Sequence, residues 1–415
     1  MKRYAITCAL ILLIVVSLGT YYAFGAELRL PEYRLQTIEG DPSIAAKLTL
    51  SGSYIGGKGS YPIEVSISGS KRIERTFSDQ WMRDKGPLEH IYSDLNALYE
   101  DHSGFMRRKS DVYGFYSDQD VLIFANASYA TPKDSLHEGN IRWSIDSLDL
   151  TTGEQTRYTD QQPSSAFYAN VIDVQKIGSE VHVLTEVSRE NRNNEVIDKV
   201  FDIGRGEPVR SVELPLGAPS GTGQELRIRS IPEAKPTVAN SRVLFVVTEQ
   251  SEGQSGKAVS TNEVTIFTEK TFEYRYASED LKELPPVTGP LRNEPVTSTT
   301  RVLEGDIFTT LHISDKAVTV DRYDLSSNLA HSQVTIEASQ IAKGRISQAQ
   351  VANGQVYLLL QTGDYFKNKN MPIAAVADAA DGHILYKGTP AIVKANGRPA
   401  DQLDEVSFLN MYITR

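Results

Sequence analysis

A seven-residue pattern that occurs four times constrains this chain more than any other feature. In each copy an Asp ends a strand-like run and a Gly or Asn follows four residues later; the copies are Leu148–Glu154, Phe201–Glu207, Tyr323–Leu329 and Ala377–His383. An Asp carboxylate can accept hydrogen bonds from the backbone N–H groups just ahead of it, and Gly and Asn tolerate a positive φ. The pattern therefore predicts four structural turns, at Asp149 and Gly153, Asp202 and Gly206, Asp324 and Asn328, and Asp378 and Gly382.

The spacing of these turns indicates a repeat. The four Asp residues are separated by 53, 122 and 54 positions, so the middle gap is close to two units. A second marker, a tight turn followed by an apolar strand, runs in phase with the first; examples are Gly178–Glu180 before Val181–Leu184 and Asn353–Gln355 before Val356–Leu360. A period of about 50–60 residues in a strand-rich chain is typical of a β-propeller.

The fold we expect is all-β: a six-bladed propeller, with five or seven blades as alternatives and an irregular pair of sandwiches as the outside option. Each unit would run strand, tight turn, strand, long loop, strand, Asp–Gly turn, strand; one unit has a degenerate turn at Tyr276–Asp280, with Asp280 in the Gly position. The C-terminal strand at 406–413 has no partners after it, and the strands at 48–77 lack a first strand. Pairing the two would close the ring and remove both open edges.

The N-terminus carries a targeting signal. Lys2 and Arg3 precede an apolar run from Ala5 to about Gly25, which is long enough to span a bilayer. We expect residues 1–26 to be an uncleaved transmembrane anchor with a cytoplasmic N-terminus, residues 27–47 a stalk, and residues 48–415 the extracytoplasmic propeller. The alternative is a signal peptide cleaved after Gly25, which would release a secreted protein. Residues 87–100 have helical apolar spacing and predict one amphipathic helix that packs on the sheets.

Net charge and cysteine content exclude some classes of partner and site. The net charge is −10, so a phosphate backbone is repelled and nucleic acid is an unsuitable partner. The single cysteine, Cys8, lies in the apolar segment, which excludes a disulfide or thiolate metal site in the folded region and hints at a bacterial cell surface.

The repeat units, above all Ala375–Tyr386, resemble the blades of bacterial extracytoplasmic propellers of the quinoprotein type. The resemblance implies the architecture alone. Its turn residues hold blades together and bind no cofactor, so it implies neither an activity nor a cofactor for this chain.

A search for catalytic motifs finds none. Gly52–Ser60 approaches a phosphate-binding loop, but Gly59 stands where Ser or Thr must follow Lys58, and a strand follows in place of a helix. The seven histidines lack ligand spacing, and His182 and His312 are expected to be core or sheet-face residues. We therefore predict no metal and no cofactor.

Loop length is distributed by face. In a four-stranded blade, the loops between strands two and three emerge on the same face as the loops between blades, and here those are the long ones, including 129–140, 160–170, 250–262 and 363–370. Loops on a rigid scaffold carry binding groups. The expected ligand-binding residues are Tyr129, His137, Arg192, Tyr365, Phe366 and Lys367.

Two functions fit these features. The first is a membrane-tethered binding, sensory or scaffold module for a protein, peptide or cell-wall glycan. The alternative is a cell-surface hydrolase or lyase that uses carboxylates in the propeller funnel, which no acidic sequence excludes.

Overall fold

The computed structural model describes residues 12–17, 30–56, 59–73, 98, 101–109, 111–130, 139–164, 166–189, 194–217, 225–231, 239–251, 266–285, 297–362, 372–396 and 406–413. These residues form an almost all-β fold, which confirms the expected class. Besides the helical residues 12–17, the helices among them are single turns: α4 (Ser103–Met106), α5 (Ala338–Ile341), η2 (Pro42–Ala45) and η4 (Val112–Gly114).

The described strands assemble into six antiparallel sheets, numbered here I to VI. Sheet I contains β26 (Val406–Ile413), β2 (Leu48–Gly56), β3 (Gly59–Ser66) and β4 (Gly69–Arg72). Sheet II contains β5 (Phe115–Ser117), β6 (Val121–Ala130), β7 (Gly139–Asp149) and β8 (Gln155–Ser164). Sheet III contains β9 (Ala166–Ile177), β10 (Glu180–Arg189), β11 (Asn194–Asp202) and β12 (Glu207–Leu214).

Sheets IV to VI continue in chain order. Sheet IV contains β13 (Glu225–Ile231), β14 (Arg242–Ser251), β15 (Ile266–Arg275) and β16 (Asp280–Glu283). Sheet V contains β17 (Ser298–Glu304), β18 (Ile307–Ile313), β19 (Ala317–Asp324), β20 (Leu329–Ala330) and β21 (Val334–Glu337). Sheet VI contains β22 (Arg345–Ala352), β23 (Gln355–Gln361), β24 (Ile373–Asp378), β25 (Ile384–Lys394) and β1 (Glu32–Gly40).

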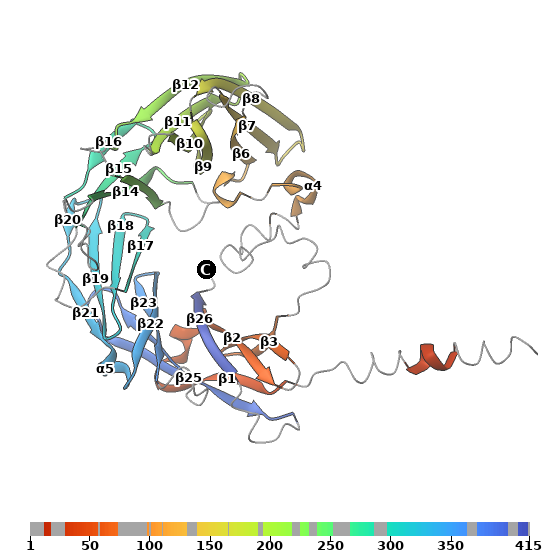
Figure 1. The fold of residues 1–415 in the computed structure, drawn as a ribbon, viewed down its shortest axis with the longest axis vertical. Coiled ribbons are helices and arrows are strands. Elements are labelled where there is room, and N and C mark those ends of the chain that lie inside the picture. The colour runs from red at the N-terminus through yellow and green to blue at the C-terminus, as the bar shows by residue number, and fades with distance from the viewer. Residues whose placement is uncertain are drawn as a thin grey trace, which may run out of the picture.

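The sheets follow one another around an arc, as in a β-propeller (Figure 1). Neighbouring sheets bury apolar side chains between them at five junctions: I with VI, VI with V, V with IV, IV with III, and III with II. The middle strands supply most of this core because both of their faces are covered; in β23, Val356 to Leu360 are all buried. The core is thus a series of layers between sheets.

The first and last described strands of the chain lie in adjacent sheets. β26 pairs antiparallel with β2, so the last described strand belongs to the sheet that β2, β3 and β4 begin. β1 pairs with the outer side of β25 and adds a fifth strand to sheet VI. Tyr33 and Leu35 of β1 are fully buried. The expected stalk at 27–47 is therefore wrong over its described part, because alternate apolar residues dock this segment onto sheet VI.

Two expected features lie largely outside the described residues. Of the predicted helix at 87–100 only Leu98 is described, and of the predicted anchor at 1–26 only residues 12–17, which are helical. Among the residues that the structure covers, no helix is long and apolar enough to cross a membrane.

The expected loop at 160–170 is also wrong. β8 runs to Ser164 and β9 begins at Ala166, so the two strands nearly meet. β8 is the outer strand of sheet II, and its residues alternate between exposed and half-buried without one fully buried side chain. A polar sequence can therefore form an edge strand, although its composition resembles that of a loop.

Candidate functional site

The connections between strands fall on two opposite edges of the sheets. One edge, here called the short-turn rim, carries turns such as 150–154, 178–179, 203–206, 325–328 and 353–354. The other, the long-connection rim, carries the links between β14 and β15 (252–265), β23 and β24 (362–372) and β25 and β26 (395–405). The division has exceptions, because 232–241 is a long link on the short-turn rim and 314–316 is a short one on the opposite rim.

Aspartates organise the turns of the short-turn rim. Asp149 Oδ1 accepts hydrogen bonds from the N–H groups of Thr151 (2.9 Å) and Thr152 (2.7 Å), and Asp202 Oδ1 does the same for Gly204 (2.8 Å) and Arg205 (3.0 Å). Gly153 and Gly206 have φ values of +76° and +74°. The N–H of each glycine also bonds the carbonyl of its Asp, so both turns close in the same way.

The turns at Asp324 and Asp378 have the same construction. Asp324 Oδ1 accepts from the N–H of Ser326 (2.8 Å), and Asp378 Oδ1 accepts from the N–H of Ala380 (2.6 Å). Asn328 and Gly382 hold positive φ values of +59° and +77°. Hydrogen bonds from Ser326 and Ser327 lower the pKa of Asp324 well below its usual value, so its carboxylate stays ionised in the turn.

The degenerate turn of sheet IV differs from expectation. Glu279, not Asp280, holds the left-handed position, with φ of +57°. Asp280 already pairs with Arg275 as the first residue of β16. The Glu279 carboxylate is bound by Arg210 from sheet III. A contact with the neighbouring sheet therefore holds a residue that is neither Gly nor Asn in this conformation.

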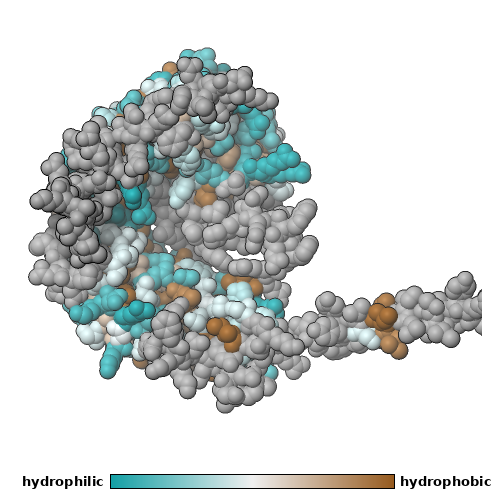
Figure 2. Space-filling model, in the orientation of Figure 1, coloured by the Kyte–Doolittle hydropathy of each residue, from teal (hydrophilic) through white to brown (hydrophobic). Residues whose placement is uncertain are grey.

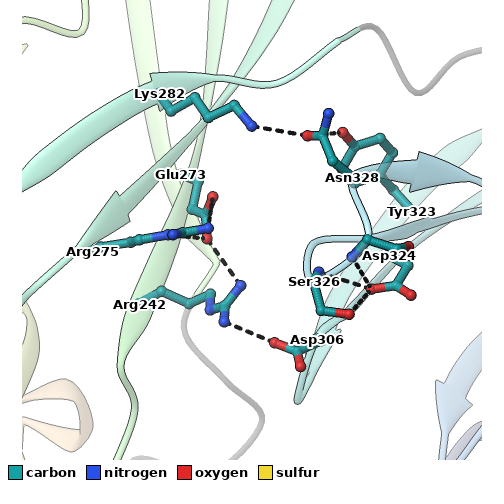
Figure 3. A network of polar contacts seen from close by, with 10 residues as sticks. Arg242, Glu273, Arg275, Lys282, Asp306, Tyr323, Asp324, Ser326 and Asn328 are labelled. Atoms are coloured by element: carbon teal, nitrogen blue, oxygen red, sulfur yellow. Dashed lines mark hydrogen bonds and ion pairs between the residues drawn. The ribbon is translucent and has the colours of Figure 1, made fainter.

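Charged side chains connect the sheets along the same rim. Figure 3 shows the junction between sheets IV and V, where Arg242 lies between Glu273 (3.0 Å) and Asp306 (2.8 Å). In the same view Lys282 Nζ donates to Asn328 Oδ1 at 2.9 Å. Sheet IV thus contacts two turns of sheet V, one at Asp306 and one at Asn328.

Other junctions repeat this arrangement. Tyr158 OH of sheet II donates to the carbonyl of Ile203 in a turn of sheet III (3.0 Å). Glu304 of sheet V accepts from the N–H groups of Asn353 (2.8 Å) and Gly354 (3.3 Å) in a turn of sheet VI. With the Arg210–Glu279 contact, four successive junctions use short turns as attachment points. The short-turn rim is therefore largely committed to holding sheets together.

Only one of the six predicted ligand-binding residues is described. Tyr129 lies at the end of β6 on the long-connection rim, half-buried against the core between sheets II and III, with its ring over Gly139. His137, Arg192, Tyr365, Phe366 and Lys367 lie outside the described residues.

The described part of the long-connection rim presents a patch that the sequence did not reveal. It consists of Asp111, Tyr113, Tyr168 and Glu186, hereafter the acidic tyrosine patch. The 3-10 turn η4, which begins just after Asp111, contacts β9, the strand that carries Tyr168. Tyr113 and Tyr168 are 42 % and 48 % exposed, and they are the only tyrosines among the exposed large side chains of the described residues.

Hydrogen bonds fix the two carboxylates of the patch. Asp111 Oδ1 accepts from the N–H of Tyr113 at 3.1 Å, and Glu186 Oε1 accepts from Asn194 Nδ2 at 3.0 Å. Ser188 Oγ in turn donates to Asn194 Oδ1 at 2.5 Å, which orients the amide. The two carboxylates therefore come from different sheets, II and III, but are both held in place.

Burial raises the pKa values of Asp111, Glu186 and Tyr168 in this patch. Desolvation raises the pKa of Asp111 and of Glu186, although a hydrogen bond opposes it in each case. Partial burial raises the pKa of the Tyr168 hydroxyl, and the charges of Glu186 and Asp111 raise it further. Tyr168 thus presents a neutral ring with a phenol donor beside two carboxyl groups.

No sequence pattern indicated this patch. Tyr168 falls in the segment expected to be a loop, and Asp111 and Glu186 are 75 positions apart. Their proximity depends on the docking of sheet II against sheet III, which no local pattern encodes.

Metal-site geometry does not occur in the part of the chain that the structure covers. No group of three or more His, Cys, Asp or Glu side chains there could hold a metal ion. His182 and His312 are buried within strands, and each lies beside an aspartate.

Figure 2 shows the surface turned to the viewer as mostly hydrophilic or intermediate over the described residues, with hydrophobic residues in small separate spots.

No protein-family model matches the chain, and no curated protein matches it. Solved structures with similarity include a Dos1 propeller, with a TM-score of 0.29 and 11 % identity, covering 61 % of this chain and 55 % of that one. An ulvan lyase of a new polysaccharide lyase family has a TM-score of 0.37 and 8 % identity, covering 86 % and 85 %.

The β-propeller domain of the Trilobed protease from Pyrococcus furiosus has a TM-score of 0.27 and 8 % identity, covering 69 % of this chain and 98 % of that one. These neighbours are propeller proteins at the level of architecture. This chain spans little more than half the length of the Dos1 propeller structure.

Proposed function

We propose that this protein is a membrane-tethered, extracytoplasmic β-propeller of six blades that acts as a binding, sensory or scaffold module. Its ligand would be a protein, a peptide or a cell-wall glycan, held at the long-connection rim. The observation that carries the proposal is that the two rims differ in structure. Short turns attach sheets to one another, whereas the opposite rim bears the long connections and the acidic tyrosine patch.

The patch supports a polar ligand with hydrogen-bond donors. A carboxylate accepts hydrogen bonds from hydroxyl or ammonium groups, and an exposed tyrosine ring offers a flat apolar face to a sugar ring or a cation. The net charge of −10 disfavours anionic ligands. Polyhydroxylated glycans and peptides with basic residues are therefore the classes to test first.

The proposed location is supported by the N-terminal sequence. Lys2 and Arg3 before the apolar run favour a cytoplasmic N-terminus and an exported remainder. A protease added to intact cells should then degrade residues 27–415. Full protection of that region in intact cells would refute the orientation.

Ligand binding is tested with one substitution on each rim. Tyr168→Ala in the full-length chain should weaken binding to isolated cell-wall glycan, or to a basic peptide array, by about tenfold, as expected for an aromatic contact of about 1–2 kcal/mol. Leu329→Ala is the matched control, because Leu329 is 62 % exposed on the short-turn rim. If only the Leu329 variant bound more weakly, the ligand would lie on the short-turn rim and the proposal would be contradicted.

One observation favours the alternative, a carboxylate-dependent hydrolase or lyase. Burial raises the pKa of both Asp111 and Glu186, which is the direction that a general acid requires. Glu186→Gln should then abolish cleavage of a susceptible polysaccharide while binding persists. Absence of cleavage by the wild-type chain across a panel of wall polysaccharides would leave the binding module as the function.

A further inference from the structure

A buried polar network joins sheets III and IV, away from the acidic tyrosine patch. Its titratable members are Asp173 on β9, His182 on β10, Asp198 on β11, and Tyr274 and Tyr276 at the end of β15. Each of these five residues is at most 4 % exposed. Most of the layer around them is apolar, so these ionisable groups are cut off from solvent.

Hydrogen bonds in the network cross from one sheet to the other. Tyr274 OH donates to Asp198 Oδ2 at 2.7 Å, and Tyr276 OH donates to Asp173 Oδ2. A third crossing bond runs from the N–H of Asn240 to Gln175 Oε1 at 2.8 Å. Both carboxyl groups therefore take part in the attachment of sheet IV to sheet III.

Within sheet III the carboxyl groups have further partners. His182 Nδ1 lies 2.7 Å from Asp198 Oδ2, and Gln175 Nε2 donates to Asp173 Oδ1 at 3.1 Å. The N–H of Val174 also donates to Asp173 Oδ1, at 2.9 Å. Asp198 Oδ1 is buried and accepts no hydrogen bond within the described part of the chain.

The charges of this layer do not balance. Two carboxyl groups share one potential cation, His182, and β14 contributes apolar side chains to this layer, among them Val243 and Phe245. The other charged neighbours, Glu180 on β10, Arg210 on β12 and Glu279 after β15, lie at the rim and bind one another. A buried carboxylate without a compensating cation is costly, and the usual remedy is a proton.

We propose that this network is a proton-operated latch between sheets III and IV, which closes when one of its two buried carboxyl groups takes up a proton and loosens when the proton is released. The group is Asp173, because it lies apart from His182 and contacts only neutral donors. The latch operates whether or not the long-connection rim binds a ligand.

The acidity of Asp173 agrees with this assignment. Burial raises its pKa to about 6, against the hydrogen bonds from Tyr276, Gln175 and Val174, and the nearby charge of Asp198 raises it further. The pKa of Asp173 in the folded state lies above the unfolded value of 3.8, so protonation of this carboxyl group stabilises the folded state. This stabilisation is fully present below about pH 4 and is lost as the pH rises through about 6.

The test compares the wild-type full-length chain with Asp173→Asn, which keeps the shape of the protonated carboxyl group. Urea unfolding is followed at pH 5.0 and pH 7.5. The folding equilibrium constant of the wild type relative to the variant should be about tenfold larger at pH 5.0 than at pH 7.5, from the two pKa values. Asp120→Asn, an exposed carboxylate on the short-turn rim, serves as the control for the loss of any aspartate.

Two further measurements keep the proposal testable if Asp173→Asn folds poorly. Infrared difference spectra of the wild type should show a protonated carboxyl band that disappears between pH 5.0 and pH 7.5. Tyr276→Phe should move this step to higher pH, because loss of the donor from sheet IV disfavours the ionised carboxylate. The latch would be overturned if the ratio of the folding equilibrium constants of the wild type and Asp173→Asn did not change with pH. It would also be overturned if the infrared band were absent, or if Tyr276→Phe left the pH at which the band disappears unchanged.

Discussion

At the scale of single residues, the turn aspartates show how one side chain can accept the hydrogen bonds of backbone N–H groups where the sheet ladder ends. Asp149 and Asp202 each bond two backbone N–H groups that have no partner in the sheet. The glycine four residues later then reverses the chain at positive φ. Both residues are needed, because the Asp satisfies the donors and the Gly supplies the conformation.

Two of these glycines differ in a way that a pair of substitutions can test. Gly153 has open space where a Cβ would lie, whereas at Gly206 a Cβ would come within 2.7 Å of the ring of Tyr158 from sheet II. Gly153→Ala should cost about 1 kcal/mol through backbone strain alone. Gly206→Ala should cost about 1 kcal/mol more, because the ring must move and its bond to Ile203 is disturbed.

Urea unfolding of the two variants measures this difference. Equal losses in the two variants would contradict the contact between Tyr158 and the turn, and no loss in either would contradict the left-handed conformation.

At the scale of elements, charged side chains at strand ends and in turns fasten one sheet to the next. Glu273 of β15 is almost wholly buried and receives two arginines, Arg242 and Arg275, each at 3.0 Å. Arg242 continues to Asp306 in sheet V. One carboxylate thus organises the junction in Figure 3.

Removal of the Glu273 carboxylate should destabilise the folded protein strongly. Glu273→Ala leaves two arginines without their shared partner, and we expect about 2–4 kcal/mol of destabilisation. Glu283→Ala is the control, since its pair with Lys270 is exposed at 3.4 Å and should contribute less than about 1 kcal/mol. Thermal and urea unfolding of both variants compare the pairs, and similar losses would show that burial does not set the strength of this junction.

The sequence predicted elements with a strong local signal and missed those without one. The Asp–Gly turns and the apolar second strands carry their own patterns, and β10, β14 and β23 lie where the tight turns placed them. β1 was missed because only Tyr33 and Leu35 face the core. β8 was missed because an exposed edge strand needs no buried side chain.

The candidate site was hardly predictable for a related reason. The acidic tyrosine patch and the network around Asp173 are each assembled from two sheets, so their members are far apart in the sequence. Aspartate, tyrosine and histidine are ordinary strand or loop residues until the neighbouring sheet decides whether they are buried.

At the scale of the whole molecule, the last described strand completes the first sheet. Phe408 and Met411 of β26 are buried in the same cluster as Leu48 and Leu50 of β2. β26 also bonds sheet VI, because the carbonyl of Met411 accepts from Gln348 Nε2 at 2.9 Å. The strand therefore adds to the other contacts between these sheets, such as the hydrogen bond from the N–H of Tyr33 on β1 to Ser70 Oγ on β4 at 2.9 Å.

Removal of this strand should loosen both sheets. A chain that ends at residue 405 loses the burial of Val406, Phe408, Met411 and Ile413, and we expect a loss of several kcal/mol, enough to lower the melting temperature by about 10 °C or more. A chain that ends at residue 413 is the control. An unchanged melting temperature after the longer truncation would mean that β26 is dispensable for closure.

The binding face of the molecule is tested most directly by hydrogen exchange of the full-length chain with and without a cell-wall glycan or basic peptide that it binds. Protection should concentrate at the long-connection rim, in 111–114, 166–170, 186–194 and 362–372. The turns at 150–154, 203–206, 325–328 and 379–383 should exchange at the same rates in both samples, because those turns serve to hold the sheets together. Protection confined to these turns, with the opposite rim unchanged, would contradict the assignment of the binding face.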